Sequence, residues 1–146
     1  RYLSKYDYIF LDSNPTMSII NINAFICCDS IILVSDIDSD SIGAVSTFLS
    51  LYYPIRDRVD RRLGDNVRGL VVNKIIDSNN MTKDFLEYIN SDAFMFGDIL
   101  LDSNIHHAVA IAETKITREP VDIRKNKRSY DEFVALIEEM LEKGVL

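Results

Sequence analysis

Four hydrophobic runs are the most regular feature of the amino-acid sequence, and none of them alternates cleanly between apolar and polar positions. They cover residues 8–12, 30–35, 67–73 and 94–101. Apolar residues at successive positions are typical of strands that are buried on both faces, as in a parallel sheet. We therefore expect four strands in a mostly parallel sheet.

Helical periodicity fills the intervals between these runs. Apolar residues recur every three or four positions in residues 17–28, 41–63, 82–90, 104–113 and in a last helix from Ser129 onward. Ser129 and Glu132 have the spacing of a capping box, and Pro54 should kink or split the long helix that contains it. Strands that alternate with helices predict an α/β fold, a sheet flanked by helices with right-handed crossovers, in a single domain of residues 1–146.

Composition and charge narrow the class of protein. The 146 residues have the length of one domain, and 47% hydrophobic with 27% charged residues argue for a buried core and against disorder. No apolar run approaches the length of a membrane span. The net charge of −7 argues against a broadly basic nucleic-acid surface. The adjacent Cys27 and Cys28 are expected to be reduced, which fits the cytoplasm. The first residue is Arg1 rather than Met, so we expect a segment whose beginning lies elsewhere.

Polar side chains gather where the predicted strands end. The residues at these ends are Asp12, Ser13, Asn14 and Pro15 for the first run, Ser35, Asp36 and Asp38 for the second, Asn73, Lys74 and Asp77 for the third, and Asp102, Ser103 and Asn104 for the fourth. In open α/β sheets, ligands bind beyond the carboxyl ends of the strands. A hydrophobic strand that ends in Asp is typical of a Walker B element, whose carboxylate holds Mg²⁺ through water. Asp12 is therefore a candidate magnesium ligand, and the alternative is that it caps the next helix or starts a turn.

Asn73 follows the hydrophobic part of the third run in the sequence "VVNK". A carboxamide at a strand end can donate to and accept from the edge of a nucleotide base at once. The alternative is a turn residue. Asp77 lies four positions after Asn73, so the guanine-reading pattern N-K-x-D is not met, and adenine is slightly favoured.

The order of these motifs resembles the ParA/MinD family of partition ATPases. The stretch "YDYIFLDSNPT" followed by "NINAFICCDSIILV" is similar to the family's strand, aspartate and proline of the switch II region, then a helix with an Asn–Ala pair and a step into the next strand. "GLVVNK" is similar to the family's adenine-side strand, and "AIAETKITREPVDI" to a helix with an acid that leads to a pre-proline turn.

The resemblance implies a P-loop NTPase-like fold of the SIMIBI type and an ATPase that acts in plasmid or chromosome partition. In the complete protein, Asp12 would hold Mg²⁺ through water, Pro15 would belong to the switch, Asn73 would read adenine, and Asp102 would lie in the loop near the base. ATP and Mg²⁺ would close a homodimer, which would bind DNA nonspecifically and a centromere-binding partner protein in a cytoplasmic, nucleoid-associated setting. A MinD-like membrane role is not expected, because the last helix carries acids rather than a basic face.

The family's phosphate-binding loop has no counterpart in the sequence. Gly64 and Gly69 have the P-loop spacing, but Leu70 and Val71 follow where lysine and a hydroxyl residue belong. The chain therefore resembles the C-terminal part of such an ATPase, with the N-terminal part missing. We expect no ATPase activity from this segment alone, neither ATP nor Mg²⁺ bound to it, and an exposed sheet edge or apolar face.

Clustered basic residues suggest a contact with DNA. They are Arg56, Arg58, Arg61 and Arg62. Phosphate attraction needs only such clustering. Interleaved acids give the alternative of a salt-bridged, solvated helix face, and these acids are Asp57, Asp60 and Asp65. His106 and His107 fall in the helical pattern without partners at helical spacing, so we expect no metal site there.

A non-enzymatic receiver-like or flavodoxin-like α/β binding module is the rival interpretation. A receiver needs an acidic pocket around a phosphorylatable aspartate and a lysine at a later strand end. Asp12 and Lys74 have the residue types and positions for these two roles.

Overall fold

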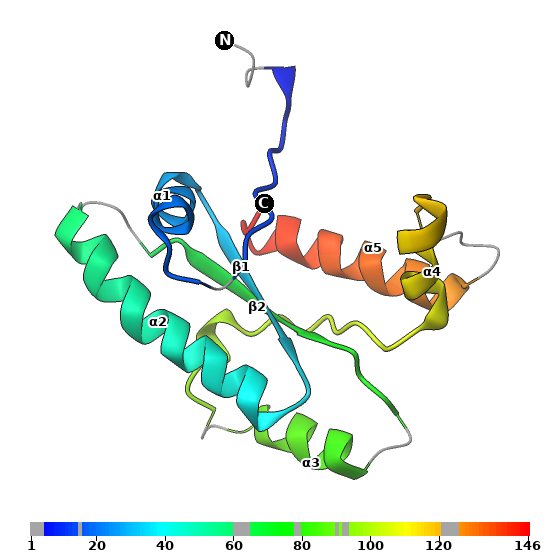
Figure 1. Ribbon diagram of the computed structural model, residues 1–146. Coiled ribbons are helices and arrows are strands. Elements are labelled where there is room, and N and C mark those ends of the chain that lie inside the picture. The colour runs from blue at the N-terminus through cyan, green and yellow to red at the C-terminus, as the bar shows by residue number, and fades with distance from the viewer. Residues whose placement is uncertain are drawn as a thin grey trace.

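The computed structural model describes residues 5–14, 16–59, 65–77, 80–89, 91, 94–120 and 126–146. Its elements, in chain order, are α1 (Ile19–Cys27), β1 (Ile31–Asp36), α2 (Ser39–Val59), β2 (Val67–Asn73), α3 (Asn80–Ile89), the 3-10 turn η2 (Gly97–Ile99), α4 (Val109–Thr117) and α5 (Lys127–Glu142), as Figure 1 shows. The described part of the chain therefore has the predicted α/β architecture, with a small parallel sheet and helices around it.

Strands β1 and β2 pair in parallel over their whole length, as their apolar runs predict. Ile31 lies opposite Val67, and Asp36 lies opposite Asn73. The side chains of β2 alternate between two hydrophobic clusters, with Leu70 and Val72 in one and Val71 in the other. Both faces of β2 are therefore covered, which explains why its sequence is apolar at successive positions.

The predicted strand at residues 94–101 is wrong in its placement. Residues 94–99 form turns, and Phe94 and Phe96 are buried with their rings 5.5 Å apart in an edge-to-face contact. The backbone that runs beside β2 comes later: the N–H of Leu101 donates to the carbonyl of Leu70 at 2.9 Å, and that of Ile105 to Val72 at 3.0 Å. The first half of this run thus buries aromatic side chains, and residues 100–107 form the parallel neighbour of β2.

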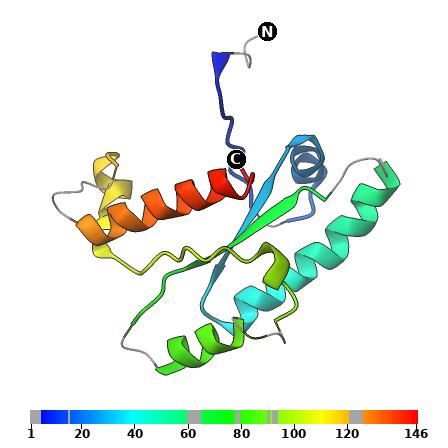
Figure 2. The ribbon, with the colours of Figure 1, turned by 180° about the vertical axis from the view of Figure 1, so that it is seen from behind.

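The predicted strand at residues 8–12 does not form in the described structure. The segment is extended and leaves the body of the protein in both views (Figures 1 and 2). Its large apolar side chains are exposed. A strand needs a hydrogen-bonding neighbour for its backbone. Among the described residues no other strand lies along this segment, so its sequence pattern alone does not make it part of the sheet.

Helix boundaries follow side-chain caps. Ser18 caps α1 by accepting the backbone N–H of Asn21 at 3.2 Å. α2 continues through Pro54, so the expected splitting of this helix does not occur. α5 begins at Lys127 with Asn126 as its cap, because the Asn126 side chain accepts the N–H of Ser129 at 3.0 Å. The predicted capping box at Ser129 is therefore wrong, and the helix expected from residue 104 begins only at Val109.

Two separate hydrophobic clusters show that helices cover both faces of the sheet. α1 and α2 bury Phe25, Phe48 and Tyr52 in the first cluster, which also contains Ile31 of β1. α5 buries Leu136 and Met140 in the second cluster, which also contains residues of β2 and of the segment beside it. No described helix is both long enough and apolar enough to cross a membrane.

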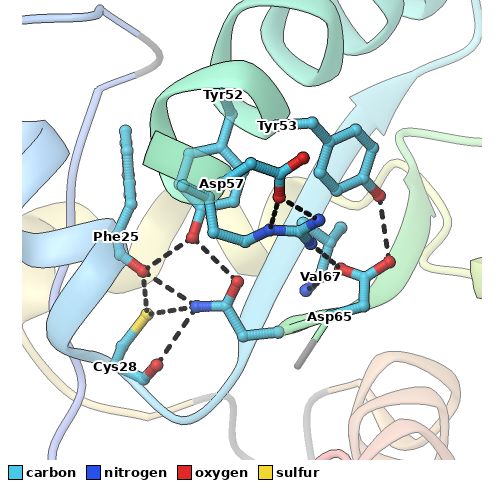
Figure 3. A network of polar contacts seen from close by, with 9 residues as sticks. Phe25, Cys28, Tyr52, Tyr53, Asp57, Asp65 and Val67 are labelled. Carbon is cyan, nitrogen blue, oxygen red and sulfur yellow. Dashed lines mark hydrogen bonds and ion pairs between the residues drawn. The ribbon is translucent and has the colours of Figure 1, made fainter. Parts of the chain in front are cut away.

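A polar network fixes α1 and α2 to the beginning of the sheet (Figure 3). The Tyr52 hydroxyl lies 2.8 Å from the side-chain oxygen of Asn66 and 3.1 Å from the carbonyl of Phe25. The Asn66 amide donates to the same carbonyl at 2.8 Å and to that of Cys28 at 3.2 Å. Burial raises the pKa of the Cys28 thiol, so it stays protonated. This network lies before β2 and is therefore at the opposite edge of the sheet from the candidate site.

Candidate functional site

The carboxyl ends of β1 and β2 bring three predicted residues together. Asp36 and Asn73 are register partners, and the ammonium of Lys74 forms an ion pair with the Asp36 carboxylate. Lys74 has a φ of 58°, a left-handed conformation that residues other than glycine seldom adopt. Among the described residues, no hydrogen-bond partner occupies the Asn73 carboxamide. The base-reading role of Asn73 at this edge of the sheet stays a prediction.

The acid Asp38, which follows β1, caps the start of α2. The Asp38 carboxylate accepts the backbone N–H of Ser41 at 2.6 Å and its hydroxyl at 2.8 Å. These two hydrogen bonds, the backbone one first, lower the pKa of Asp38. Asp38 is thus a helix cap, a position at which an acid is favoured.

Asp12 is not brought together with Asn73 in the described structure. It lies on the exposed segment that precedes α1, and no hydrogen bond or ion pair links it to the strand-end residues. Pro15, the predicted switch residue, lies outside the described residues. Within the described part of the chain, no group of three or more His, Cys, Asp or Glu residues is arranged to hold a metal.

Asn21 organises the loop that follows Asp12, and the sequence pattern did not point to it. Its side-chain amide lies 2.6 Å from the side-chain oxygen of Asn14 and 2.9 Å from the carbonyl of Thr16. Asn14 and Thr16 also hydrogen-bond to each other at 2.7 Å. The loop that resembles a nucleotide switch is therefore held against the first turn of α1.

Asp102 lies within the segment beside β2 and not at its carboxyl end. Its backbone N–H and that of Ser103 donate to the two carboxylate oxygens of Glu139, each at 2.7 Å. The Asp102 side chain is 90% exposed and, among the described residues, pairs with Lys143 at 3.2 Å. The placement of Asp102 at a strand end was wrong, because the segment runs on beside β2 as far as Ile75 and His106.

His106 occupies the strand-end position that the sequence assigned to Asp102. Its two ring nitrogens lie 2.9 Å from an Asp77 oxygen and 2.8 Å from a Glu132 oxygen. Arg128 contacts the same two acids, at 2.8 and 2.9 Å. The hydrogen bond from Arg128, followed by the charge of His106, lowers the pKa of Asp77. Because His106 falls in a helical pattern, the sequence did not predict its position beside the sheet. The apolar residue immediately before it was the only local sequence signal for a strand there.

Arg56 already has charged and aromatic partners within the protein. Its guanidinium pairs with Asp57 at 2.9 Å and Asp65 at 3.2 Å and lies 4.6 Å from the centre of the Tyr53 ring, and its side chain is 15% exposed. This arrangement agrees with the salt-bridged alternative at this position. Arg58 is exposed, whereas Arg61 and Arg62 lie outside the described residues.

We expect alanine at Arg56 to lower the free energy of unfolding by about 1 kcal/mol, because the substitution removes a cation–π contact and two ion pairs. Alanine at the exposed Arg58 should change the free energy of unfolding by less than about 0.5 kcal/mol. Urea denaturation of both variants measures the difference. Equal effects of the two substitutions would contradict a structural role for Arg56.

The described residues also line a cavity of about 620 Å³, which lies away from the predicted site. Asp65 and Val67 line it at the beginning of β2, together with residues of the 3-10 turn and Lys143. Because ligands of α/β sheets bind at the opposite, carboxyl edge, this cavity does not support the nucleotide site.

Comparison with known families finds a match for the beginning of the chain. Residues 2–64 match a family described as an AAA domain. This region is similar to P-loop ATPase domains. Such domains bind nucleotide and Mg²⁺ in general. The match includes Asp12, α1, β1 and α2, and it ends before β2.

Two curated relatives come from Mycobacterium tuberculosis, and both are named as uncharacterized proteins. They are MT1749 of strain CDC 1551 / Oshkosh and Rv1708 of strain ATCC 25618 / H37Rv, each 24% identical over 119 residues, or 82% of this chain. The aligned region is 36% of each relative, so the chain spans about a third of the length of the curated relatives it matches. No solved structure matches the chain significantly.

Proposed function

We propose that this chain is the C-terminal part of a ParA-type ATPase of plasmid or chromosome partition. The match of residues 2–64 to a P-loop ATPase-type domain carries the proposal. The order of the motifs that follow supports it, with Asn73 and Lys74 at the carboxyl edge of the sheet. Asp12 would supply the magnesium carboxylate and Asn73 the base contact, in a site completed by a phosphate-binding loop elsewhere in a longer polypeptide.

Exposed apolar groups support a missing neighbour along β1. Within the described residues β1 has one strand partner, and its Val34 side chain is 63% exposed. On α5, one flank of exposed apolar residues also has no covering layer, and these residues are Tyr130, Phe133, Ile137 and Leu141. Apolar surface of this extent marks an interaction face. We infer that the phosphate-binding part of the protein pairs along β1 and covers this face.

The wider biology of the protein belongs to the same proposal. ATP-dependent homodimerisation, nonspecific DNA binding, a centromere-binding partner protein and a nucleoid-associated location all follow from the resemblance to ParA-type ATPases. Among the described arginines of this cluster, the exposed Arg58 is a better candidate for DNA binding than Arg56, whose guanidinium is already paired.

A receiver-like module is less well supported by the geometry. It requires Asp12 and Lys74 in one acidic pocket, whereas Lys74 pairs with Asp36 and Asp12 lies on the separate N-terminal segment. Labelling of Asp12 by acetyl phosphate in the 146-residue chain would favour the receiver over the ATPase segment.

The 146-residue chain is expected to show no ATP hydrolysis above background, because phosphoryl transfer depends on a phosphate-binding loop that it lacks. A version extended at its N-terminus through the upstream coding region should bind and hydrolyse ATP. In that version, Asp12→Asn should reduce turnover by roughly 100-fold, since magnesium and its charge neutralisation dominate the reaction. Phosphate release assays measure both proteins.

Asp7 provides the matched control, because it is an exposed acid on the same segment. Asp7→Asn should leave the turnover of the extended protein unchanged. Turnover by the 146-residue chain itself, or equal effects of the two substitutions, would contradict the proposed role of Asp12.

A further inference from the structure

His106 joins three parts of the fold that are distant in sequence. Asp77 comes from the loop after β2, His106 from the segment beside β2, and Glu132 and Arg128 from the first turns of α5. The His106 side chain is 22% exposed and that of Glu132 is 15% exposed. Glu132 also accepts the backbone N–H of His106 at 3.0 Å, so a single carboxylate holds both the ring and the main chain.

Both ring nitrogens of His106 face carboxylate oxygens, at 2.9 and 2.8 Å. A neutral imidazole has one N–H and one lone pair, so it can donate to only one of these acids and repels the other. The nitrogen beside Glu132 is buried and has no hydrogen bond within the described part of the chain, which leaves the ion pair as its compensation. An imidazolium carries a positive charge that is attracted to both carboxylates.

The charge balance of the cluster leads to the same protonation state. Among the described residues, the groups that face the ring are the Asp77 and Glu132 carboxylates, and the Arg128 guanidinium pairs with both. These described groups carry two negative charges and one positive charge, which is a net charge of −1 around a neutral ring. A protonated His106 brings the net charge of the cluster to zero, which lowers the cost of holding partly buried carboxylates together.

The cluster is connected by the backbone to the candidate base-reading residue. The N–H of Ile75 donates to the carbonyl of Ile105 at 3.1 Å, and the N–H of His107 donates to the carbonyl of Ile75 at 2.9 Å. Ile75 is two residues after Asn73, and the left-handed Lys74 lies between them. The position of Asn73 therefore depends on how firmly residues 75–77 are held against residues 105–107.

We propose that His106 is a positioning residue which, as an imidazolium, locks α5 and the 105–107 segment to the loop that follows Asn73. Loss of a ring proton releases one carboxylate and loosens this lock, so the carboxyl edge of the sheet becomes less ordered as the pH rises. The consequence for base recognition rests on the proposed function. The lock itself can be measured on the 146-residue chain without nucleotide.

Amide hydrogen exchange of Ile75 and His107, corrected for the intrinsic exchange rate at each pH, tests the lock. We expect protection factors about tenfold higher at about pH 5 than at about pH 9, on either side of the range in which histidine titrates. In His106→Gln, protection should be low at both values. In Glu132→Gln, whose amide can pair with a neutral ring, the change with pH should shrink to about twofold.

His107 is the matched control, because its ring is exposed and only its backbone joins the ladder. His107→Gln should keep the pH dependence of the unchanged protein. Flat protection factors in the unchanged protein, or His106→Gln with normal protection, would overturn the lock. An intact lock in a chain whose extended version fails to bind ATP would leave the lock standing and reject the proposed function.

Discussion

Alanine in place of Tyr52 is expected to lower the free energy of unfolding by about 3–5 kcal/mol. The Tyr52 side chain is fully buried, stacks on Phe48 with ring centres 5.5 Å apart, and meets the edge of Phe25 at 6.1 Å. The substitution would leave a large cavity between α1, α2 and the sheet, and would also remove the hydroxyl that contacts Asn66. Urea denaturation followed by circular dichroism measures this loss.

Two further variants separate packing from hydrogen bonding. Tyr52→Phe keeps the ring and removes only the hydroxyl, so it should cost about 1–2 kcal/mol, because buried acceptors lose a donor. Tyr53→Ala, at a less buried neighbour on the same helix, should cost less than Tyr52→Ala. A Tyr52→Ala protein as stable as Tyr53→Ala would show that the aromatic cluster does not support the fold as described.

Protonation of Glu139 is expected to destabilise the protein in acid. Although burial acts to raise it, hydrogen bonds from Lys143, Ser103 and Asp102 lower the pKa of Glu139 from 4.5 to about 2. Because the pKa is lower in the folded protein, the stabilisation is fully present above the ordinary value of 4.5 and is lost as the pH falls toward about 2. With a side chain that is 12% exposed, the contribution at neutral pH is about 2–3 kcal/mol.

Glu139→Gln should remove most of this pH dependence and lower the midpoint of urea denaturation at neutral pH. Glu138, an exposed acid next to it on α5, is the matched control, and Glu138→Gln should leave both the midpoint and its pH dependence nearly unchanged. The midpoints of both variants between about pH 2 and about pH 7 provide the comparison. Equal acid sensitivity of the Glu139→Gln and unchanged proteins would contradict an anchoring role for this carboxylate.

Much of the sheet and of its candidate site could be predicted from local sequence. The apolar runs at residues 30–35 and 67–73 became β1 and β2 because both faces of the sheet are covered by helices. Asn73 and Lys74 follow the apolar part of the second run, so their arrival at the carboxyl edge beside Asp36 was predictable from register alone. The cap at Asp38 agrees with the preference of helix starts for acids.

Other parts of the site could not be predicted, because the same local sequence pattern is compatible with more than one role in the tertiary structure. The run at residues 94–101 is apolar, but its aromatic side chains are used as buried anchors and its strand-like backbone begins only near Leu100. Glu132 has the spacing of a capping box, but its carboxylate binds His106 across the fold. The segment before Asp12 has a strand pattern without a strand to pair with in the described structure.

The sequence by itself determined where β1 and β2 end and which residue types stand at those ends. Periodicity and turn chemistry act over a few neighbouring residues, so these features are encoded locally. Only the tertiary structure decided which charged groups meet. Arg128 and Asp77 pair across 51 positions, and the Glu139 carboxylate accepts the backbone N–H of Ser103 across 36, because the stacking of α5 on the sheet brings them together. No local pattern specifies such distances, since they depend on how whole elements pack.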